Sequence, residues 1–294
     1  MYLPMQQVDV FTDQPLAGNP LAVFWNLPPQ FPGFLMQQLA REMNLSESIF
    51  ITALPDPDSH YSVRIFTPET ELPFAGHPSL GGFFSLCRHG LLTNQGVQHS
   101  EAGASQLAMD AQGLIWVTPP PGHTEEIKLP MAHIAEALGV DLSWISVDTP
   151  PGLAGTGRLL QLIVPLATDQ VSLLRPDPVK LQGLGARLGA TGVYVLAQTG
   201  PATYHARFFG MGIGIGEDPA TGSAAAAFGT YLLKTTGATA IQRYKIYQGA
   251  EIGRPSLLWV RLNAHGVGSL DVGGSVVPVL EGTVEIPDDR VFRD

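Results

Sequence analysis

The sequence predicts an α+β protein of two similar halves, each with one apolar helix enclosed by strands. The first observation is a repeat, because the order of strand and helix patterns in the first half returns in the second. The second concerns two helices that start near His77 and near Asp218, which carry small or apolar residues around most of their circumference. The third is size, since 294 residues with 45% hydrophobic and 14% charged content can fill two domain cores.

Short alternating or continuous apolar runs predict the strands, and apolar residues at helical spacing predict the helices. In the first half, strands are predicted at 7–11, 21–25, 49–51, 61–66, 107–109 and 114–118, and helices at 34–43 and from 83 to Gly90. In the second half, strands are predicted at 158–164, 192–197 and 205–209, and helices at 131–138 and 179–188. The helix that starts near Asp218 completes the pattern.

The run Pro119-Pro120-Pro121-Gly122 interrupts the chain and is the best linker candidate. We therefore expect an N-terminal half at 1–120 and a C-terminal half at 121–280. The last residues, 281–294, are expected to complete the N-terminal half.

Two pairs of motifs indicate the repeat. Arg64-Ile65-Phe66 aligns with Arg207-Phe208-Phe209 at an offset of 143 residues, and His77-Pro78 aligns with Asp218-Pro219 at an offset of 141. The duplication predicts that the two helix N-termini face each other across a cleft between the halves, and such clefts favour ligands. Free N–H groups and the positive end of a helix dipole suit an anionic group there. An ordinary helix with Asp218 as N-cap and Pro219 as its first residue explains the second motif equally.

Glu47 stands between a helix end and a buried strand, where a carboxylate is commonly a surface or capping group. The repeat offers a second interpretation, because the matching place in the second half, Ala190-Thr191-Gly192, holds no acid. A carboxylate in one copy only, beside the predicted cleft, fits a single group that transfers a proton. Both interpretations stay open at this point.

Other charged residues and the cysteine have simpler interpretations. Glu69 and Glu71 lie in a predicted turn and are expected to be solvated. Arg254 either supports the cleft or stabilises a turn. Cys87 lies among Phe and Leu residues of a predicted helix and is expected to fill the core.

Composition excludes several classes of partner. The net charge of −10 argues against nucleic acid and against an anionic membrane surface. No apolar run reaches the roughly 18 residues of a membrane span, and the start lacks a signal-peptide pattern. A single cysteine fits a reducing cytoplasm, so we expect a cytoplasmic protein. The histidines show no metal-binding spacing, and Gly212, Gly214 and Gly216 do not match a dinucleotide-binding loop.

Several ordered motifs resemble the PhzF-like family of isomerases, which is named after phenazine biosynthesis. The resemblance covers nearly the whole chain and rests on residues 8–12, 18–23, 45–48, 66–68, 71–78, 217–224, 248–249, 253–256 and 273–276. The family is similar in fold to diaminopimelate epimerase. The resemblance therefore implies two halves, each a strand-rich, barrel-like sheet around a central helix, with the site between them.

The resemblance also implies roles for individual residues. Glu47 is implied as the general acid/base, which takes a proton from one carbon of a small unsaturated or amino-substituted carboxylate and returns it to another. His77 and Asp218 are implied as further catalytic residues that orient the substrate and aid the transfer. The implied substrate-binding residues, which lie at or near the two helix starts, are Asn19, Gly76, Pro78, Ser79, Gly222 and Ser223. The family implies no cofactor and no metal, and it suggests a homodimer.

The chain departs from the related patterns in two places. Diaminopimelate epimerase has cysteines at the matched helix starts, where this chain has His77 and Asp218, which disfavours epimerisation by a cysteine pair. In the loop Gly210–Gly216, Met211 replaces the usual proline and glycine recurs at every second position. The particular reaction is therefore left open between a carbon-to-carbon isomerase, an amino-acid epimerase and a non-catalytic binding protein that keeps the fold.

Overall fold

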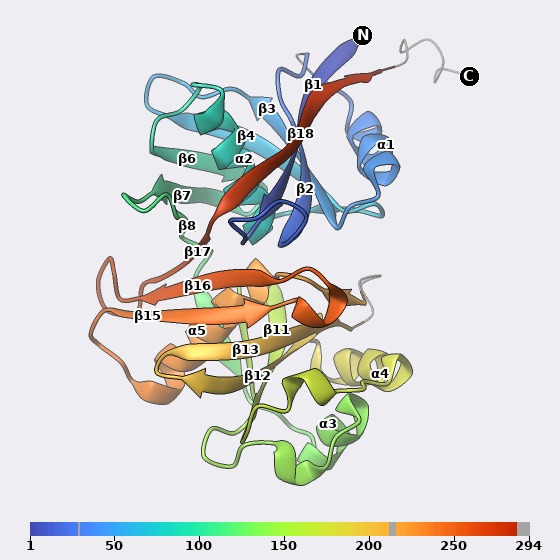
Figure 1. Ribbon diagram of the computed structural model, residues 1–294, viewed down its shortest axis with the longest axis vertical. Helices are drawn as coiled ribbons and strands as arrows, with labels where there is room; N and C mark the ends of the chain where they lie inside the picture. The colour runs from blue at the N-terminus through green and yellow to red at the C-terminus, as the bar shows by residue number, and fades with distance from the viewer. Residues whose placement is uncertain (29, 212–215, 287–294) are drawn as a thin grey trace. The chain divides into compact units, whose positions relative to one another are not determined.

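The computed structural model describes residues 1–28, 30–211 and 216–286, and the chain divides into two compact units (Figure 1). Unit 1 comprises Met1–Leu16, Pro20–Val117 and a segment that begins at Ser275, and unit 2 comprises Ala17–Asn19 and Thr118–Gly274. The short segment Ala17–Asn19 therefore packs with unit 2, although unit 1 surrounds it in sequence. Within the described residues, no helix has the length and apolar character needed to cross a membrane.

Unit 1 is built mainly from strands. Its helices are α1 (Gly33–Met43) and α2 (Gly76–Arg88). Its strands are β1 (Tyr2–Val10), β2 (Asn19–Phe24), β3 (Glu47–Ala53), β4 (His60–Phe66), β5 (Glu71–Leu72), β6 (Gln95–Ser100), β7 (Gly103–Met109), β8 (Ile115–Val117) and β18 (Val276–Glu285).

Unit 2 has a similar composition of elements. Its helices are α3 (Met131–Leu138), α4 (Pro178–Leu188) and α5 (Gly222–Thr236), with 3-10 turns η1 (Leu142–Trp144), η2 (Val171–Leu173) and η3 (Ala250–Ile252). Its strands are β9 (Gly122–Glu125), β10 (Gly152–Thr156), β11 (Leu159–Leu166), β12 (Gly192–Gly200), β13 (Thr203–Gly210), β14 (Glu217–Asp218), β15 (Gln242–Gln248), β16 (Ser256–Leu262) and β17 (Leu270–Gly274).

The local sequence explains where α4 begins and ends. The Asp177 side chain accepts hydrogen bonds from the N–H groups of Val179 and Lys180, and Pro178 takes the first helical position, where its missing N–H costs nothing. Gly189 ends the helix in the left-handed conformation that glycine adopts without strain. The same logic ends α1, where Asn44 takes the left-handed conformation.

The strand pairing of the two units is the same. In unit 1, β2 is parallel to β3, β4 is antiparallel to β3 and β5, and β6 is parallel to β4 and antiparallel to β7. In unit 2, β11 is parallel to β12, β13 is antiparallel to β12 and β14, and β15 is parallel to β13 and antiparallel to β16. Because a parallel pair needs a crossover, each unit places two helices at matching points. The pairing confirms the predicted duplication.

One helix in each unit is enclosed by strands. α2 packs against β1, β3, β8 and β18, and α5 packs against β9, β10, β11, β16 and β17. Most side chains of both helices are buried. Glycines permit the close approach, since a β-carbon added at Gly81 would lie 2.4 Å from Leu21 Cδ2. This arrangement confirms the predicted fold class, a strand-rich, barrel-like sheet around a central helix in each half.

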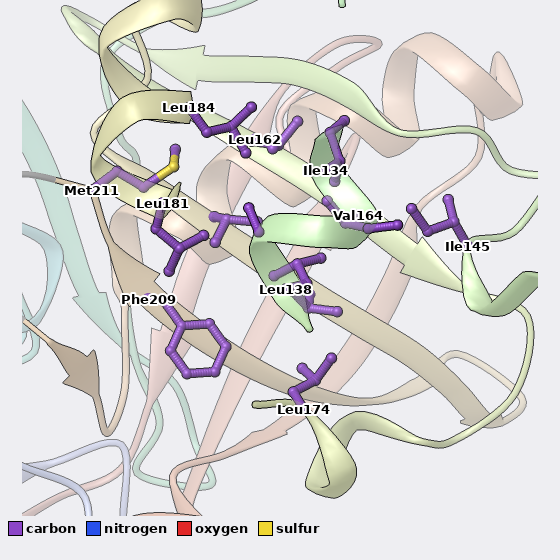
Figure 2. Close-up of a cluster of buried hydrophobic side chains, with 14 of the residues drawn as sticks. Ile134, Leu138, Ile145, Leu162, Val164, Leu174, Leu181, Leu184, Phe209 and Met211 are labelled. Carbon is purple, nitrogen blue, oxygen red and sulfur yellow. The ribbon is translucent and has the colours of Figure 1, made fainter. Parts of the chain in front are cut away.

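The outer helices cover a second face of each sheet. In unit 1, α1 contributes Leu35, Met36 and Leu39 to a buried cluster that includes the stacked rings of Phe24 and Phe50. In unit 2, Figure 2 shows the corresponding cluster, with side chains from α3 and α4 packed over β11 and β13. Each unit therefore holds one apolar layer outside its sheet and one around its central helix.

Strand register corrects one part of the sequence alignment. Leu72 of β5 lies opposite Ile65, and Asp218 of β14 lies opposite Phe208. Ile65 and Phe208 occupy the same place in the repeated arginine motif. Asp218 is therefore the counterpart of Leu72 and not of His77.

The starts of the central helices give the same correction. α2 begins at Gly76 and α5 at Gly222, which is an offset of 222 − 76 = 146 residues, not 141. The second residue of α2 is His77 and that of α5 is Ser223. The shared prolines of His77-Pro78 and Asp218-Pro219 misled the alignment, because one proline lies inside a helix and the other precedes one.

The enclosure of α5 predicts a stability effect. A β-carbon at Gly229 would lie 2.4 Å from Leu270 Cδ1 and 2.9 Å from Val260 Cγ1. Gly229→Ala should therefore lower the free energy of unfolding by about 1–3 kcal/mol through overpacking. Gly183→Ala in α4, where nothing lies within 4 Å, should raise it by up to about 1 kcal/mol. Urea denaturation of both variants measures the difference, and equal effects would contradict the enclosure.

Candidate active site

Glu47 and His77 meet inside unit 1. Glu47 is the first residue of β3, and His77 is the second residue of α2. His77 Nε2 and Glu47 Oε2 are 3.4 Å apart, and the side chains are 5% and 12% exposed. The structure therefore brings together two of the three predicted catalytic residues, which we call the Glu47–His77 pair.

Burial decides the protonation state of His77. Removal from water disfavours the charged ring and lowers the pKa of His77 from 6.5 to about 3. At neutral pH the ring is therefore uncharged, with one N–H that donates and one nitrogen that accepts. A neutral imidazole beside a carboxylate can orient a ligand by donating or accepting a hydrogen bond, and it does not neutralise the carboxylate.

The counterpart of Glu47 in unit 2 is Gly192. Leu21 pairs with Glu47 and Gln161 pairs with Gly192 in the matching parallel strands. A β-carbon at Gly192 would lie 2.1 Å from the ring of Phe208, which fills the space a side chain would need. The absence of an acid from the second copy, noted in the sequence, thus follows from packing.

Asp218 lies in a buried polar cluster of unit 2. Asn19 Nδ2 donates to Asp218 Oδ1 at 3.0 Å, and the Thr221 hydroxyl donates to Asp218 Oδ2. Burial raises the pKa of Asp218 from 3.8 to about 6, although these two hydrogen bonds favour the ionised form and lower it. We call Asn19, Asp218 and Thr221 the Asp218 cluster. Its carboxyl group titrates near neutral pH.

The structure also settles how α5 begins. Asp218 belongs to β14, and the N-cap of α5 is Thr221, so the interpretation of Asp218 as an N-cap is wrong. Neither Thr221 nor Ala75, the N-cap of α2, makes a side-chain capping hydrogen bond. The first N–H groups of both helices are therefore not satisfied by their own caps.

The remaining predicted residues lie in the first turns of the two helices. Gly76, Pro78, Ser79 and Gly222 are buried, whereas Ser223 is half-buried. The Ser79 hydroxyl donates to Ala75 O and accepts from Gln98 Nε2. Both hydrogen bonds of the Ser79 hydroxyl are therefore made within the protein.

Arg254 supports the segment that carries Asn19. Its guanidinium donates to the carbonyl oxygens of Gly18 at 2.9 Å and Ala17 at 2.7 Å, and the Gly18 N–H donates to Pro255 O. Of the two expected roles, the turn is the one observed. The consequence for the site is indirect, because this turn holds Asn19 against Asp218.

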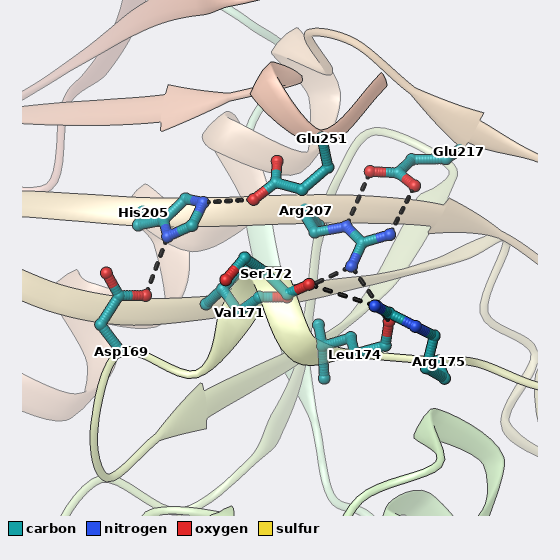
Figure 3. Close-up of polar contacts among 9 residues, drawn as sticks. All are labelled: Asp169, Val171, Ser172, Leu174, Arg175, His205, Arg207, Glu217 and Glu251. Atoms are coloured by element: carbon teal, nitrogen blue, oxygen red, sulfur yellow. Dashed lines mark hydrogen bonds and ion pairs between the residues drawn. The ribbon is translucent and has the colours of Figure 1, made fainter. Parts of the chain in front are cut away.

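An arginine–glutamate pair beside each central helix was missed from the sequence. Arg64 donates to both carboxylate oxygens of Glu71, and Arg207 does the same with Glu217 (Figure 3). Each pair fixes the two-residue strand that precedes the helix. The Glu71 side chain remains 32% exposed, as expected of a solvated residue, but it lies in a strand and pairs with Arg64. The recurrence of Arg and Glu around the repeat was the available signal.

The structure says little about the glycine-rich loop and about the expected lack of a metal site. The glycine-rich loop Gly210–Gly216 includes residues 212–215, which lie outside the described residues. Within the described part of the chain, no three His, Cys, Asp or Glu side chains are grouped so that they could hold a metal ion.

Comparison with known proteins agrees with the geometry. The family model described as phenazine biosynthesis-like protein (PhzC-PhzF) matches residues 8–282. A relative from Pseudomonas aeruginosa, named trans-2,3-dihydro-3-hydroxyanthranilate isomerase, is 33% identical over 283 residues, which cover 94% of this chain and 96% of the relative. The chain therefore belongs to the PhzC-PhzF family and is an isomerase of that family.

Solved structures show the same fold. A predicted epimerase from Pseudomonas aeruginosa superimposes with a TM-score of 0.81 at 30% identity, covering 97% of this chain and 100% of the other. A PhzF-family protein from Bacillus anthracis has a TM-score of 0.85 at 21% identity, with the same coverage. A probable proline racemase from Agrobacterium radiobacter is similar in fold at 13% identity and a TM-score of 0.67.

The raised pKa of Asp218 predicts a pH-dependent stability. Between pH 4 and 6 the folded chain binds more protons at Asp218 than the unfolded chain, so the stabilisation from this group is lost as pH rises through 6. Asp218→Asn removes that loss. The contribution of His77 to the pH dependence is the same in wild type and variant, so it cancels in their difference. The free energy of unfolding of the variant, relative to wild type, should rise by about 2–3 kcal/mol from pH 4 to 7.

Urea denaturation at several pH values measures this difference. Asp148→Asn, which removes an exposed carboxyl group, is the control. A difference between Asp218→Asn and wild type that stays constant over this range would contradict the account of Asp218.

Proposed function

We propose that this protein is a cofactor-independent isomerase that moves a proton between two carbons of a small unsaturated or amino-substituted carboxylate, with Glu47 as general acid/base. The Glu47 carboxylate takes a proton from a C–H group, and the electron pair left behind delocalises into the adjoining double bond. Glu47, then a carboxylic acid, returns the proton to a different carbon. Atoms and electrons balance within the substrate, so the reaction needs no oxidant or reductant.

The observation that carries the proposal is the Glu47–His77 pair. A general base must keep its charge and lie in a site that excludes water. Glu47 is buried, and its neighbour His77 stays neutral because burial lowers its pKa to about 3. In the proposed reaction the neutral imidazole orients the substrate beside Glu47 and supports the carboxylic acid that forms after proton abstraction.

The Asp218 cluster supplies the second titratable group of the proposed reaction. Its carboxyl group, with a pKa of about 6, can accept or donate a proton near neutral pH. The helix starts at Gly76 and Gly222 lack side-chain caps, and free N–H groups stabilise negative charge. We propose the N–H groups at each helix start, and the side chains of Asn19 and Ser223 in unit 2, as substrate-binding groups within their own units.

A thiol does not compete with Glu47 for this role. Cys87 lies near the C-terminal end of α2, and burial raises its pKa to about 11, so the thiolate is scarce at neutral pH. This supports a carboxylate mechanism over epimerisation by cysteines. We also propose that the protein is cytoplasmic, that it forms a homodimer and that its partners are small molecules.

Deuterium exchange tests the proposed function. Wild-type protein in D₂O should incorporate deuterium at carbon when given trans-2,3-dihydro-3-hydroxyanthranilate or related unsaturated carboxylates, as NMR would detect. Glu47→Gln should slow this incorporation by about 10²–10⁴-fold, because the amide cannot take the proton. Glu69→Gln, which alters an exposed turn, is the matched control.

Two outcomes would contradict the proposal. Incorporation by Glu47→Gln at the wild-type rate would exclude Glu47 as the base. A lack of incorporation by wild type over a broad panel of unsaturated and amino-substituted carboxylates would exclude the reaction class.

A further inference from the structure

Gln248, at the end of β15, is a buried side chain to which the proposed function assigns no role. It is 1% exposed and makes four hydrogen bonds around the Asp218 cluster. Its Nε2 donates to Asp218 O at 2.8 Å and to Thr221 Oγ1 at 3.1 Å. Its Oε1 accepts from the Tyr194 hydroxyl at 3.0 Å and from the Thr221 N–H at 3.4 Å.

These partners fix which end of the Gln248 amide is oxygen and which is nitrogen. The Asp218 carbonyl can only accept a hydrogen bond, so the group that faces it must be the NH₂. The Thr221 N–H can only donate, so the group that faces it must be the oxygen. The two constraints agree, and a flipped amide would violate both.

The orientation of Gln248 determines the direction of the hydrogen bonds that follow. Because Gln248 Nε2 donates to Thr221 Oγ1, the oxygen of Thr221 is an acceptor there, and its single proton is free to donate to Asp218 Oδ2. Tyr194 begins the series, since burial and the neighbouring Asp218 both raise the pKa of its phenol and keep it protonated. The O–H of Tyr194, the Nε2 of Gln248 and the O–H of Thr221 therefore donate in sequence towards the carboxylate, while the Thr221 N–H donates back to Gln248 Oε1.

The backbone around Gln248 is packed against the Asp218 loop as well. A β-carbon at Gly249 would lie 2.5 Å from Pro219 O, so only glycine allows this approach. The following turn, η3, is held to β13 because Glu251 Oε1 lies 2.8 Å from His205 Nε2, while Asp169 contacts the other ring nitrogen (Figure 3). Gln248 thus acts from a fixed turn.

We propose that Gln248 is a positioning residue, which directs the Thr221 hydroxyl proton onto the Asp218 carboxylate and holds the Asp218 loop for the reaction. The inference rests on the proposed function for its consequence in catalysis. Its structural content stands on the hydrogen-bond directions alone. The groups that interact with Asp218 in these contacts are Asn19 and Thr221, which are neutral donors, and Tyr194, which is the titratable neighbour.

A double-mutant cycle on the pKa of Asp218 tests the inference. The pKa is measured by ¹³C NMR of the aspartate carboxyl groups, and the Asp218→Asn spectrum assigns the resonance. Thr221→Val should raise the pKa of Asp218 by about one unit, because it removes a donor to the ionised form. In a Gln248→Met background the same Thr221→Val change should shift the pKa by less than about half as much, since the hydroxyl is no longer directed.

Control variants distinguish the direction of the Thr221 hydrogen bond from a general effect of altered packing. Gln98→Met removes a buried glutamine of unit 1 that donates to Ser79, and the Thr221→Val shift should stay at its wild-type size in that background. Thr221→Ser, which keeps the hydroxyl, should leave the pKa of Asp218 near the wild-type value. If Gln248→Met does not fold, Gln248→Asn replaces it, because its side chain is too short to reach Thr221.

The outcomes are distinct from those of the proposed function. Equal Thr221→Val shifts in the wild-type and Gln248→Met backgrounds would overturn the inference, whatever the enzyme activity. If the expected coupling appears but no deuterium exchange is found, the positioning contact stands and the proposed reaction fails. If both hold, the acid limb of the exchange rate against pH should move with the measured pKa.

Discussion

The enclosure of one helix by strands in each unit is the constraint on which the rest of the structure depends. Enclosure requires small residues on the helix, as Gly81 and Gly229 show through the side chains that press on them. It also takes the first turn of the helix and its neighbours out of water. The polar groups there, His77 in unit 1 and Asp218 in unit 2, therefore have pKa values moved towards their neutral forms. The packing that builds the fold thus also shifts the pKa values of these two groups.

The two repeated units differ at the positions of the predicted site residues. Strand register matches Glu47 with Gly192, and the ring of Phe208 occupies the space of the missing side chain. It also matches Leu72 with Asp218, and the helix starts match His77 with Ser223. The buried titratable groups at these places therefore differ between the units, with Glu47 and His77 in unit 1 and Asp218 in unit 2. A buried carboxylate at the place of Glu47 in one unit only follows from this loss of symmetry between the two units.

Much of this could be predicted from the sequence. Local patterns located α3 and nearly all of α1 and α4, because apolar spacing and glycine or asparagine caps are local signals. The repeat and Glu47 as its asymmetric residue were also visible. The predicted offset between the two helix starts was wrong, because the alignment matched the prolines of His77-Pro78 and Asp218-Pro219. The hydrogen-bond partners of Gln248 and Arg254, which include Thr221 and Gly18, could not be predicted, because packing between distant segments brings them together.

The protonation state of His77 shows whether enclosure, and not the nearby carboxylate, controls the imidazole. ¹⁵N NMR of histidine-labelled protein, with the resonance assigned by His77→Asn, reports the state of both ring nitrogens at each pH. We expect a neutral ring at pH 5, because burial lowers the pKa of His77 to about 3. A ring that is doubly protonated at pH 5 and titrates near the ordinary value of 6.5 would contradict it.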